Sequence, residues 1–546
     1  MLRLSFTLYL SHMAHRFRLT IFVNLLGMLA AYGLAPHEVL VLVNKNDAAS
    51  VELANHFVHL RQIPANNVIT LALPDNRDIV TIKPSEFTQW IWEPVNQAIK
   101  ERGLEKEILA WVYSSGFPTT IATSPEMSIT GLTFTRNQIP GAVGVDSAVY
   151  TSGLFRGPER KGGPIKPTAS LDKLKVELDD AMPLPAMMLG YTWHRGNEPA
   201  MLVNMLQRGV QADGTRPPGT VYFVFMDDIR FNTRLWQMLE ARSELKSLGI
   251  AAEISNRMPD RATDRISGLM TGTQYPEIDN VSNIYPGSMC DHLTSFAARY
   301  QTHLQSKASI WFNAGATASS GTVTEPMAVW EKFPHARYYV HAAHGCSILE
   351  SFYQSVYSPL QLLILGEPFS RPYGKLIGIA LDIEGNTVKV RTGGVEPHTR
   401  LFYHFFVDGK RVGALSTKPE ITAGNLAPGA HEWQVVAITD GSISHYATMR
   451  AGFTVPGERV RWPQVPESGE VTFTGQGTLR VETDPAPESF RIWKHGEVVY
   501  EAARGGAFVD VNLEARTLGK GPSRLVAEAV FTDHSAWSRP VTVVLE

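Results

Sequence analysis

The 546-residue sequence lacks several signatures by which enzymes are commonly identified. It has no Walker loop, no G-x-G-x-x-G after a predicted strand and no H-E-x-x-H, which disfavours nucleotide binding and zincin chemistry. A nucleophile elbow of the form G-x-S-x-G is also missing, which weakens a serine-hydrolase interpretation. We therefore expect no cofactor and no metal site.

An excess of positive charge is missing as well, since the formal net charge is −3. A nucleic-acid-binding surface must be basic to displace counterions from phosphates, so we expect no nucleic-acid partner. Cysteine is limited to Cys290 and Cys346. These two could pair in an oxidising compartment or remain free as small buried apolar residues, and we favour the second alternative.

Hydrophobic residues make up 44% and charged residues 19% of the chain, which is typical of a folded globular protein. The length exceeds what one hydrophobic core supports, so two to four domains are expected.

The N-terminal segment differs from the rest of the chain. Three arginines precede an apolar run from Leu19 to Ala35 that ends in small residues, the layout of a secretory signal. The run is short for a membrane span and Asn24 interrupts it. We predict that residues 1–35 are a signal peptide or N-terminal anchor, cut near Leu34. The protein is then exported to the periplasm, cell envelope or medium, and meets a membrane only through this segment if it is not cleaved.

Residues 36–373 alternate between predicted strands and predicted helices. The alternation predicts an α/β domain whose mainly parallel sheet is covered by helices on both faces, as in caspase-like or flavodoxin-like folds. Strands are expected at 39–44, 67–73, 107–113, 220–226, 251–254, 266–272 and 308–316, and helices at 50–60, 85–102 and 233–248. Between 119 and 166, Gly, Pro and Ser predominate, which favours a mobile solvated loop over a loop that overhangs a binding cleft.

Beyond residue 373 the helical periodicity disappears. Short alternating strands separated by turn residues predict two β-sandwich modules of immunoglobulin or fibronectin type III kind, at 374–456 and 457–546. Their strands show no pattern that requires the α/β sheet, so the modules are expected to be separable.

In parallel sheets, ligands bind beyond the carboxyl ends of the strands. The turns expected to meet there are 44–47, 114–116, 227–230, 271–273 and 315–325. In the turn DDIRFNTR, Asp227 could bind a metal or orient a substrate, while Arg230 and Arg234 could clamp an anion. The favoured alternative is that an aspartate here caps a helix and pairs with an arginine. Thr271 and Thr273 are further ligand-binding candidates in the neighbouring turn.

The catalytic candidates are Ser319, His292 and Glu325. Backbone amides of the small-residue turn NAGATASSGTVTEP could form an anion nest with Ser319 or Ser320 as nucleophile, or the turn could simply let the chain pass close to a neighbour. His292 follows Cys290 and Asp291 directly, and on a predicted helix such neighbours diverge. His341 and His344 lack a fourth metal ligand at a recognisable spacing.

Several motifs between residues 37 and 373 resemble a bacterial family of uncharacterised proteins from organisms with exosortase-type protein sorting. They are NKNDAASVELANHFVHLRQIP, DDIRFNTR, PGSMCDHLTSF, NAGATASSGTVTEP and GEPFSRPYG. The resemblance implies an exported protein in species that make exopolysaccharide and sort envelope proteins.

More distantly, the layout resembles caspases and gingipains, in which a His-Gly turn ends one strand and a cysteine ends the next. The corresponding turns, 270–273 and 315–317, contain neither residue, so no catalytic residue is carried over.

Two functions follow. The favoured one is a binding or scaffolding protein of the envelope whose partner is an envelope protein or polysaccharide. The alternative is an envelope hydrolase, acting on peptide or polysaccharide, that uses the strand-end pocket of the α/β domain. Fold alone does not decide between them.

Overall fold

The computed structural model describes residues 34–141, 150–457, 459–503 and 506–546. The predicted signal segment lies outside these ranges except for Leu34 and Ala35. Within them, every helix is too short or too polar to cross a membrane.

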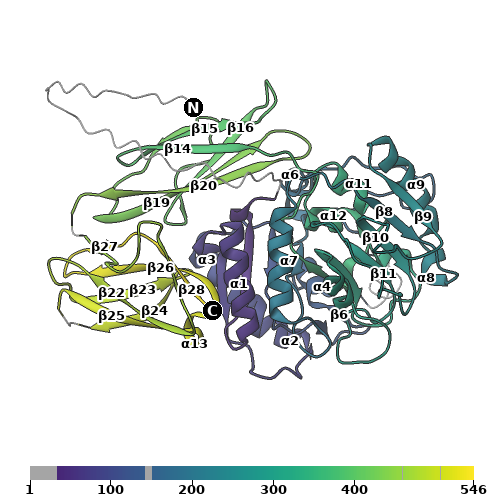
Figure 1. Cartoon of the computed structure of the whole chain (residues 1–546), viewed down its shortest axis with the longest axis horizontal. Helices are drawn as coiled ribbons and strands as arrows, with labels where there is room; N and C mark the ends of the chain where they lie inside the picture. The colour runs from purple at the N-terminus through teal and green to yellow at the C-terminus, as the bar shows by residue number, and fades with distance from the viewer. Residues whose placement is uncertain (1–33, 142–149, 458, 504–505) are drawn as a thin grey trace, which may run out of the picture.

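The N-terminal half is built on a mixed sheet of six strands in the order β12-β13-β7-β4-β1-β2 (Figure 1). Strand β1 has the sequence VLVLVN and is buried along its whole length, as an unbroken apolar run predicts. It pairs in parallel with β2 and β4, and β4 pairs in parallel with β7, whereas β12 is antiparallel to β13. The bounds are β1 Val39–Asn44, β2 Val68–Leu71, β4 Ala110–Tyr113, β7 Ala186–Met188, β12 Ala318–Thr322 and β13 Leu362–Gly366.

A second sheet of four parallel strands has the order β11-β10-β8-β9. Met289, at the start of β11, forms a parallel bridge to Ala318 of β12, so the two sheets lie edge to edge. The strands are β8 Thr220–Val224, β9 Ala252–Ser255, β10 Ile266–Gly272 and β11 Cys290–Leu293.

Helices cover the first sheet. α1 and α7 lie side by side in front of it in the view of Figure 1. On β4, Trp111 packs on Trp92 of η3, and the hydroxyl of Tyr113 contacts that of Thr133 in α4. Because Trp111 and Tyr113 are two residues apart, they point to the same face of the sheet, so η3 and α4 cover that face. The helices are α1 Ala48–Arg61, α2 Pro84–Phe87, η3 Thr88–Trp92, α3 Glu93–Glu101, α4 Ile129–Phe134, α6 Leu171–Leu178, α7 Pro199–Gln211, α8 Ile229–Asn232, α9 Leu235–Ser247, α10 Ser309–Ala314, α11 Tyr338–Ala343 and α12 Ile348–Ser355.

Three sequence predictions differ from the structure. The run 308–316, predicted as a strand, forms α10, because a short apolar run has no periodicity that distinguishes a strand from a buried helix. Cys290–Leu293, treated as helical, is the strand β11. The region 119–141, predicted as a solvated loop, contains β5 (Thr120–Ile121), β6 (Met127–Ser128) and the fully buried helix α4.

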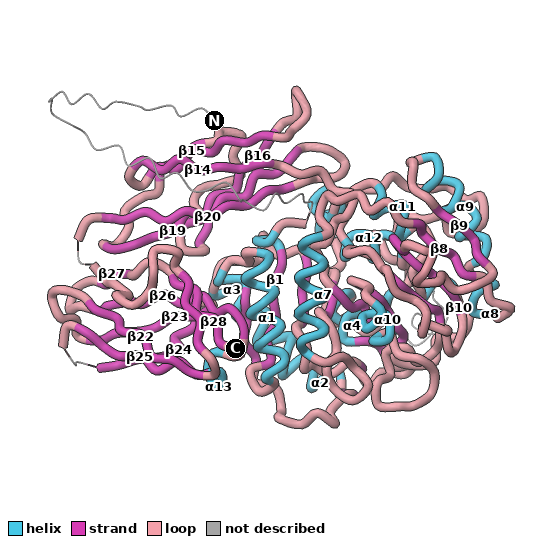
Figure 2. The backbone as a smooth tube through the Cα atoms, viewed as in Figure 1, coloured by secondary structure: helices cyan, strands magenta, loops and turns pink. Residues whose placement is uncertain are grey.

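The C-terminal part consists of short strands that form two β-sandwiches, each with its own apolar core (Figure 2). Trp433 lies at the centre of the first core and Val511 in the second. Strands of the first are β14 Gly378–Glu384, β15 Thr387–Gly393, β16 Leu401–Val407, β17 Lys410–Arg411, β18 Glu420–Thr422, β19 Gly429–Thr439 and β20 Tyr446–Val455. Those of the second are β21 Glu470–Phe473, β22 Gln476–Glu482, β23 Ser489–Lys494, β24 Glu497–Ala503, β25 Phe508–Glu514, β26 Gly521–Val530, β27 Ser535–Trp537 and β28 Val541–Leu545.

The sandwiches pack tightly on the α/β domain. Phe406, Val436 and Tyr446 of the first sandwich belong to the same buried apolar cluster as β1 and α1. In the second, the carbonyl oxygens of Leu518 and Lys520 accept hydrogen bonds from the Asn55 side chain on α1, at 2.9 and 2.8 Å. The core of the first sandwich thus continues into that of the α/β domain, and the separability of the modules stays a prediction.

A buried ionic network ties these parts together. Arg61, at the end of α1, donates to Glu367 at 3.0 and 2.6 Å and also pairs with Asp213, which follows α7. Burial raises the pKa of Asp213 to about 6, although Arg61 opposes that shift. The backbone N–H of Arg371 donates to Asp213, and its guanidinium pairs with Glu350 at 2.6 Å. The network thus joins α1, the end of α7 and α12 to the loop after β13.

We expect Glu367→Gln to lower the free energy of unfolding by about 3 kcal/mol, because the side-chain amide turns a donor towards the buried Arg61 guanidinium in place of one of its two charge-assisted acceptors. Urea unfolding followed by tryptophan fluorescence measures the change. The matched control, Asp382→Asn, removes the acid of an exposed pair with Arg391 and should cost less than about 1 kcal/mol. Equal losses in the two variants would contradict the role of the network.

Candidate functional site

Arg234, predicted to clamp a ligand, is fully buried and serves the fold. Its guanidinium donates to Asp291 at 2.8 Å and to the carbonyl oxygen of Thr271 at 2.5 Å. Asp291 also accepts a hydrogen bond of 3.0 Å from the Ser320 hydroxyl. The hydroxyl of Thr271 donates to the carbonyl oxygen of Val224 at 2.9 Å. Arg234 and Thr271 therefore link α9 to strands β8, β10 and β11 and are not available to a ligand.

The turn after β8 follows the capping alternative. Asp228 accepts a hydrogen bond of 2.9 Å from the backbone N–H of Arg230 and pairs with its guanidinium at 3.1 Å. Asp227 is exposed, and Arg230 and Thr273 are half-buried. The cap is thus Asp228, one residue after the predicted candidate, and Asp227, Arg230 and Thr273 remain near the surface.

The three catalytic candidates do not form a reactive group. His292 is buried in β11, where Nδ1 accepts a hydrogen bond of 2.9 Å from the Trp311 indole and Nε2 lies 3.2 Å from the carbonyl oxygen of Ser306. Burial lowers the pKa of His292 to about 4, so its imidazole is neutral at pH 7. Ser319 is fully buried within β12, whereas Glu325 is exposed and accepts from the backbone N–H of Met327 at 2.8 Å.

The remaining cysteine and histidine candidates are also enclosed. Burial raises the pKa values of the free, buried thiols of Cys290 and Cys346, which makes both poor nucleophiles. Nδ1 of His341 lies 2.8 Å from the hydroxyl of Thr168, and the sulfur of Cys346 accepts a hydrogen bond from Gln354 at 3.5 Å. His341 and Cys346 therefore have separate protein partners.

Polar residues that end β1 and β4 form a buried cluster. Asp47 caps α1 by accepting from the backbone N–H of Ser50 at 2.7 Å, and its second oxygen accepts from the indole of Trp193 at 2.8 Å. Gly116 has a φ of +75° and lies so close to Asp47 that a Cβ would come within 2.7 Å of it. A larger residue at 116 would displace Asp47, so this turn is fixed by packing.

The turns after β7 and β11 meet beside this cluster. The rings of Tyr191 and Tyr300 stack with centroids 4.3 Å apart. The hydroxyl of Ser309 donates to the carbonyl oxygen of Arg195 at 2.7 Å, and the side chain of Asn197 donates to the carbonyl oxygen of Ser309 at 2.9 Å. The turns after β7 and β11 therefore contact each other, although the two strands point in opposite directions, because β12 is parallel to β11 and antiparallel to β13, which is parallel to β7.

The carboxyl ends of β8, β10, β11 and β12 lead into a set of exposed apolar side chains, here named the strand-end surface. Its five members follow β8, β10, β11 and β12. Their exposed fractions are 39% for Phe225, 63% for Ile229, 58% for Tyr275, 59% for Leu304 and 62% for Met327. The turns touch one another, since the Tyr275 hydroxyl accepts from the backbone N–H of Gln305 and the Thr233 hydroxyl donates to the carbonyl oxygen of Ala328. Sequence reasoning missed this surface because an apolar residue in a turn carries no sign of its exposure.

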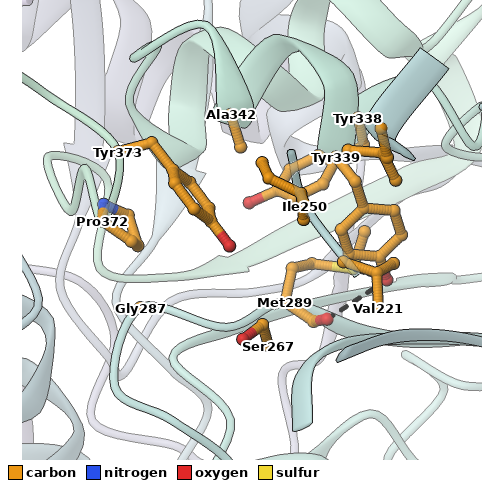
Figure 3. Close-up of a pocket in the computed structure, with 11 residues that line it drawn as sticks. Val221, Ile250, Ser267, Gly287, Met289, Tyr338, Tyr339, Ala342, Pro372 and Tyr373 are labelled. Carbon is orange, nitrogen blue, oxygen red and sulfur yellow. Dashed lines mark hydrogen bonds between the residues drawn. The ribbon is translucent and has the colours of Figure 1, made fainter. Parts of the chain in front are cut away.

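An enclosed cavity lies elsewhere, between strands β8 and β10 and helix α11 (Figure 3). Tyr339 and Met289 line one side of it, and Tyr373, Pro372 and Ser267 the other. Its volume is about 10 Å³, which is room for roughly one water molecule. The cavity is therefore too small to hold a substrate.

No protein-family model and no curated protein matches the chain. Among solved structures, the complex of the Porphyromonas gingivalis RgpB pro- and mature domains is 8% identical, with 93% of this chain and 100% of that chain covered at a TM-score of 0.33. The Arg-specific cysteine proteinase gingipain R is also 8% identical, with 94% and 98% covered at 0.33. Fibronectin(III)-like modules of Clostridium thermocellum CbhA are 15% identical, with 31% and 92% covered at 0.13. Because every one of these TM-scores is below 0.5, the function is inferred from this chain's own residues.

We expect the ring signals of His292 to stay unshifted between pH 8 and pH 5, because burial keeps its pKa near 4. In the unfolded chain the pKa of a histidine is about 6.5, so the buried neutral ring contributes its full stability above that pH. This contribution to the free energy of unfolding is lost as the pH falls towards 4. NMR of protein labelled with ¹³C-histidine measures the titration, with His292→Gln identifying the signal. A midpoint between pH 6 and 7 would show instead that the ring is open to protonation and able to act as a base.

Proposed function

We propose that this chain is a non-catalytic binding protein of the cell envelope and that the strand-end surface holds a partner protein. One contrast carries the proposal. At this edge of the sheet, His292 and Ser319 are buried, while Ile229, Leu304 and Met327 are exposed. A catalytic site needs a reachable nucleophile with a base beside it, whereas a docking surface needs apolar side chains open to contact.

The kind of partner follows from the chemistry of the surface. Three of its five members are aliphatic and offer no hydrogen bond to a sugar hydroxyl. Aromatic and aliphatic side chains, Tyr275 and Leu304 among them, are what the apolar centre of a protein interface contains. A protein partner is therefore favoured over a polysaccharide.

The place of action in this proposal is the envelope. It is supported by the arginine-flanked apolar run at the N-terminus and by the motifs that resemble the exosortase-associated family. The partner would then be an exported protein of a sorting or exopolysaccharide system.

We expect envelope-protein fragments, displayed as a library from the host genome, to be enriched on the purified full chain. Leu304→Ser and Ile229→Ser should each lower the affinity of the chain for the enriched fragments about tenfold, which corresponds to about 1.4 kcal/mol of binding free energy. The matched control is Val176→Ser, which removes an apolar side chain that is 82% exposed on α6, outside the strand-end surface. Failure to enrich any fragment, or equal weakening by Val176→Ser, would contradict the proposal.

A hydrolase would be labelled covalently by active-site probes, whereas our proposal predicts no labelling. We expect fluorophosphonate and epoxide probes, which label reactive serines and cysteines, to leave the protein unmodified. Ser319→Ala and His292→Ala should behave like the wild type, because both side chains are enclosed by the fold. Intact-protein mass spectrometry measures the labelling. A probe adduct on the wild type that disappears in either variant would establish an accessible catalytic centre.

A further inference from the structure

Three potential metal ligands meet where the first sandwich packs on the α/β domain. His37 lies in the short helix η1 (Pro36–Glu38), Glu107 precedes β4 and His404 belongs to β16. Each side chain offers one ligand atom, and the three atoms lie within 4.8 Å of one another. They form the single group of this kind within the ranges 34–141, 150–457, 459–503 and 506–546.

The fold brings these residues together from distant parts of the chain. β1 and β4 pair in parallel from Val39 and Ala110 onward, and the backbone N–H of Leu109 donates to the carbonyl oxygen of Glu38 at 2.7 Å. This pairing places the residues before the two strands side by side. β16 then packs over them, with the rings of His37 and His404 tilted at 46° and their centroids 4.3 Å apart.

One ring nitrogen of each imidazole lacks a hydrogen-bond partner. Nδ1 of His37 and Nδ1 of His404 are both buried, and neither has a hydrogen-bond partner in the structure. A buried polar atom left in this state costs about 1–3 kcal/mol, so two of them at one place point to an absent ligand.

The carboxylate of Glu107 is oriented by a neighbour. Arg411, in β17, pairs with its Oε1. A charged partner that fixes a ligating carboxylate is a common feature of metal sites. The positive charge of Arg411 opposes that of a cation, so the site should bind more weakly than one without it.

We propose that His37, Glu107 and His404 bind one divalent ion of the zinc class, with water in the remaining position, and that the ion fastens the first sandwich to the α/β domain. Two imidazoles and one carboxylate are ligands suited to Zn²⁺ and its transition-metal neighbours, whereas Mg²⁺ and Ca²⁺ prefer oxygen alone. One ligand comes from the sandwich and two from the α/β domain, so the bound ion links both parts. The proposal does not depend on the strand-end surface.

Co²⁺ provides the test, because tetrahedral or five-coordinate Co²⁺ with nitrogen ligands absorbs visible light. The full chain, purified without a histidine tag and treated with chelator, is titrated with Co²⁺ and then with Zn²⁺. We expect one Co²⁺ per chain, displacement by Zn²⁺ and a rise in the melting temperature with either ion. Mg²⁺ should have no effect on the melting temperature.

Two variants assign the ligands. His404→Gln and Glu107→Gln change half-buried side chains, and each should weaken Co²⁺ binding more than about 100-fold, beyond the 10- to 100-fold typical of losing an outer partner. The matched control, His398→Gln, removes an exposed histidine of the same sandwich and should bind Co²⁺ as the wild type does. Circular dichroism confirms that each variant is folded. The proposal would be overturned if the wild type bound no Co²⁺. It would also be overturned if both ligand variants bound Co²⁺ as tightly as the wild type does.

Discussion

The architecture depends on how the charge of Arg61 is neutralised inside the protein. This guanidinium is 1% exposed and lies between Glu367 and Asp213, which are also buried. An isolated charge would be very costly in such a place, so the ends of α1 and α7 and the loop after β13 have to converge on it. Arg371 extends the constraint to the first sandwich, because its guanidinium donates to the carbonyl oxygens of Gly345 and Ser444.

This arrangement leaves two regions with different properties. At the strand-end surface, apolar side chains are exposed, and the neighbouring buried Asp291 is satisfied by Arg234 and Ser320. Where β16 packs against the start of β1, polar atoms of His37 and His404 are buried but unsatisfied. The first pattern is that of a surface open to a macromolecule, and the second that of a small site enclosed by the fold.

Residues with catalytic chemistry are thus put to structural use in this chain. His292 orients Trp311, Arg234 neutralises Asp291, and Cys290 fills space in an apolar cluster. Each has the residue type of an active site, but each is enclosed on every side that a substrate would need. Residue type alone did not reveal that these side chains are buried.

The sequence by itself determined the alternation of strands and helices, the buried run of β1 and the strand-rich C-terminal part, because these follow from local periodicity and turn chemistry. It also indicated that turns after parallel strands converge. Only the tertiary structure decided that 309–314 is a helix, that Arg234 and Ser319 are buried and that Leu304 is exposed. It alone placed His404 beside His37. The physical reason is that burial and long-range contacts depend on how whole elements pack, and no local pattern in the chain records that packing.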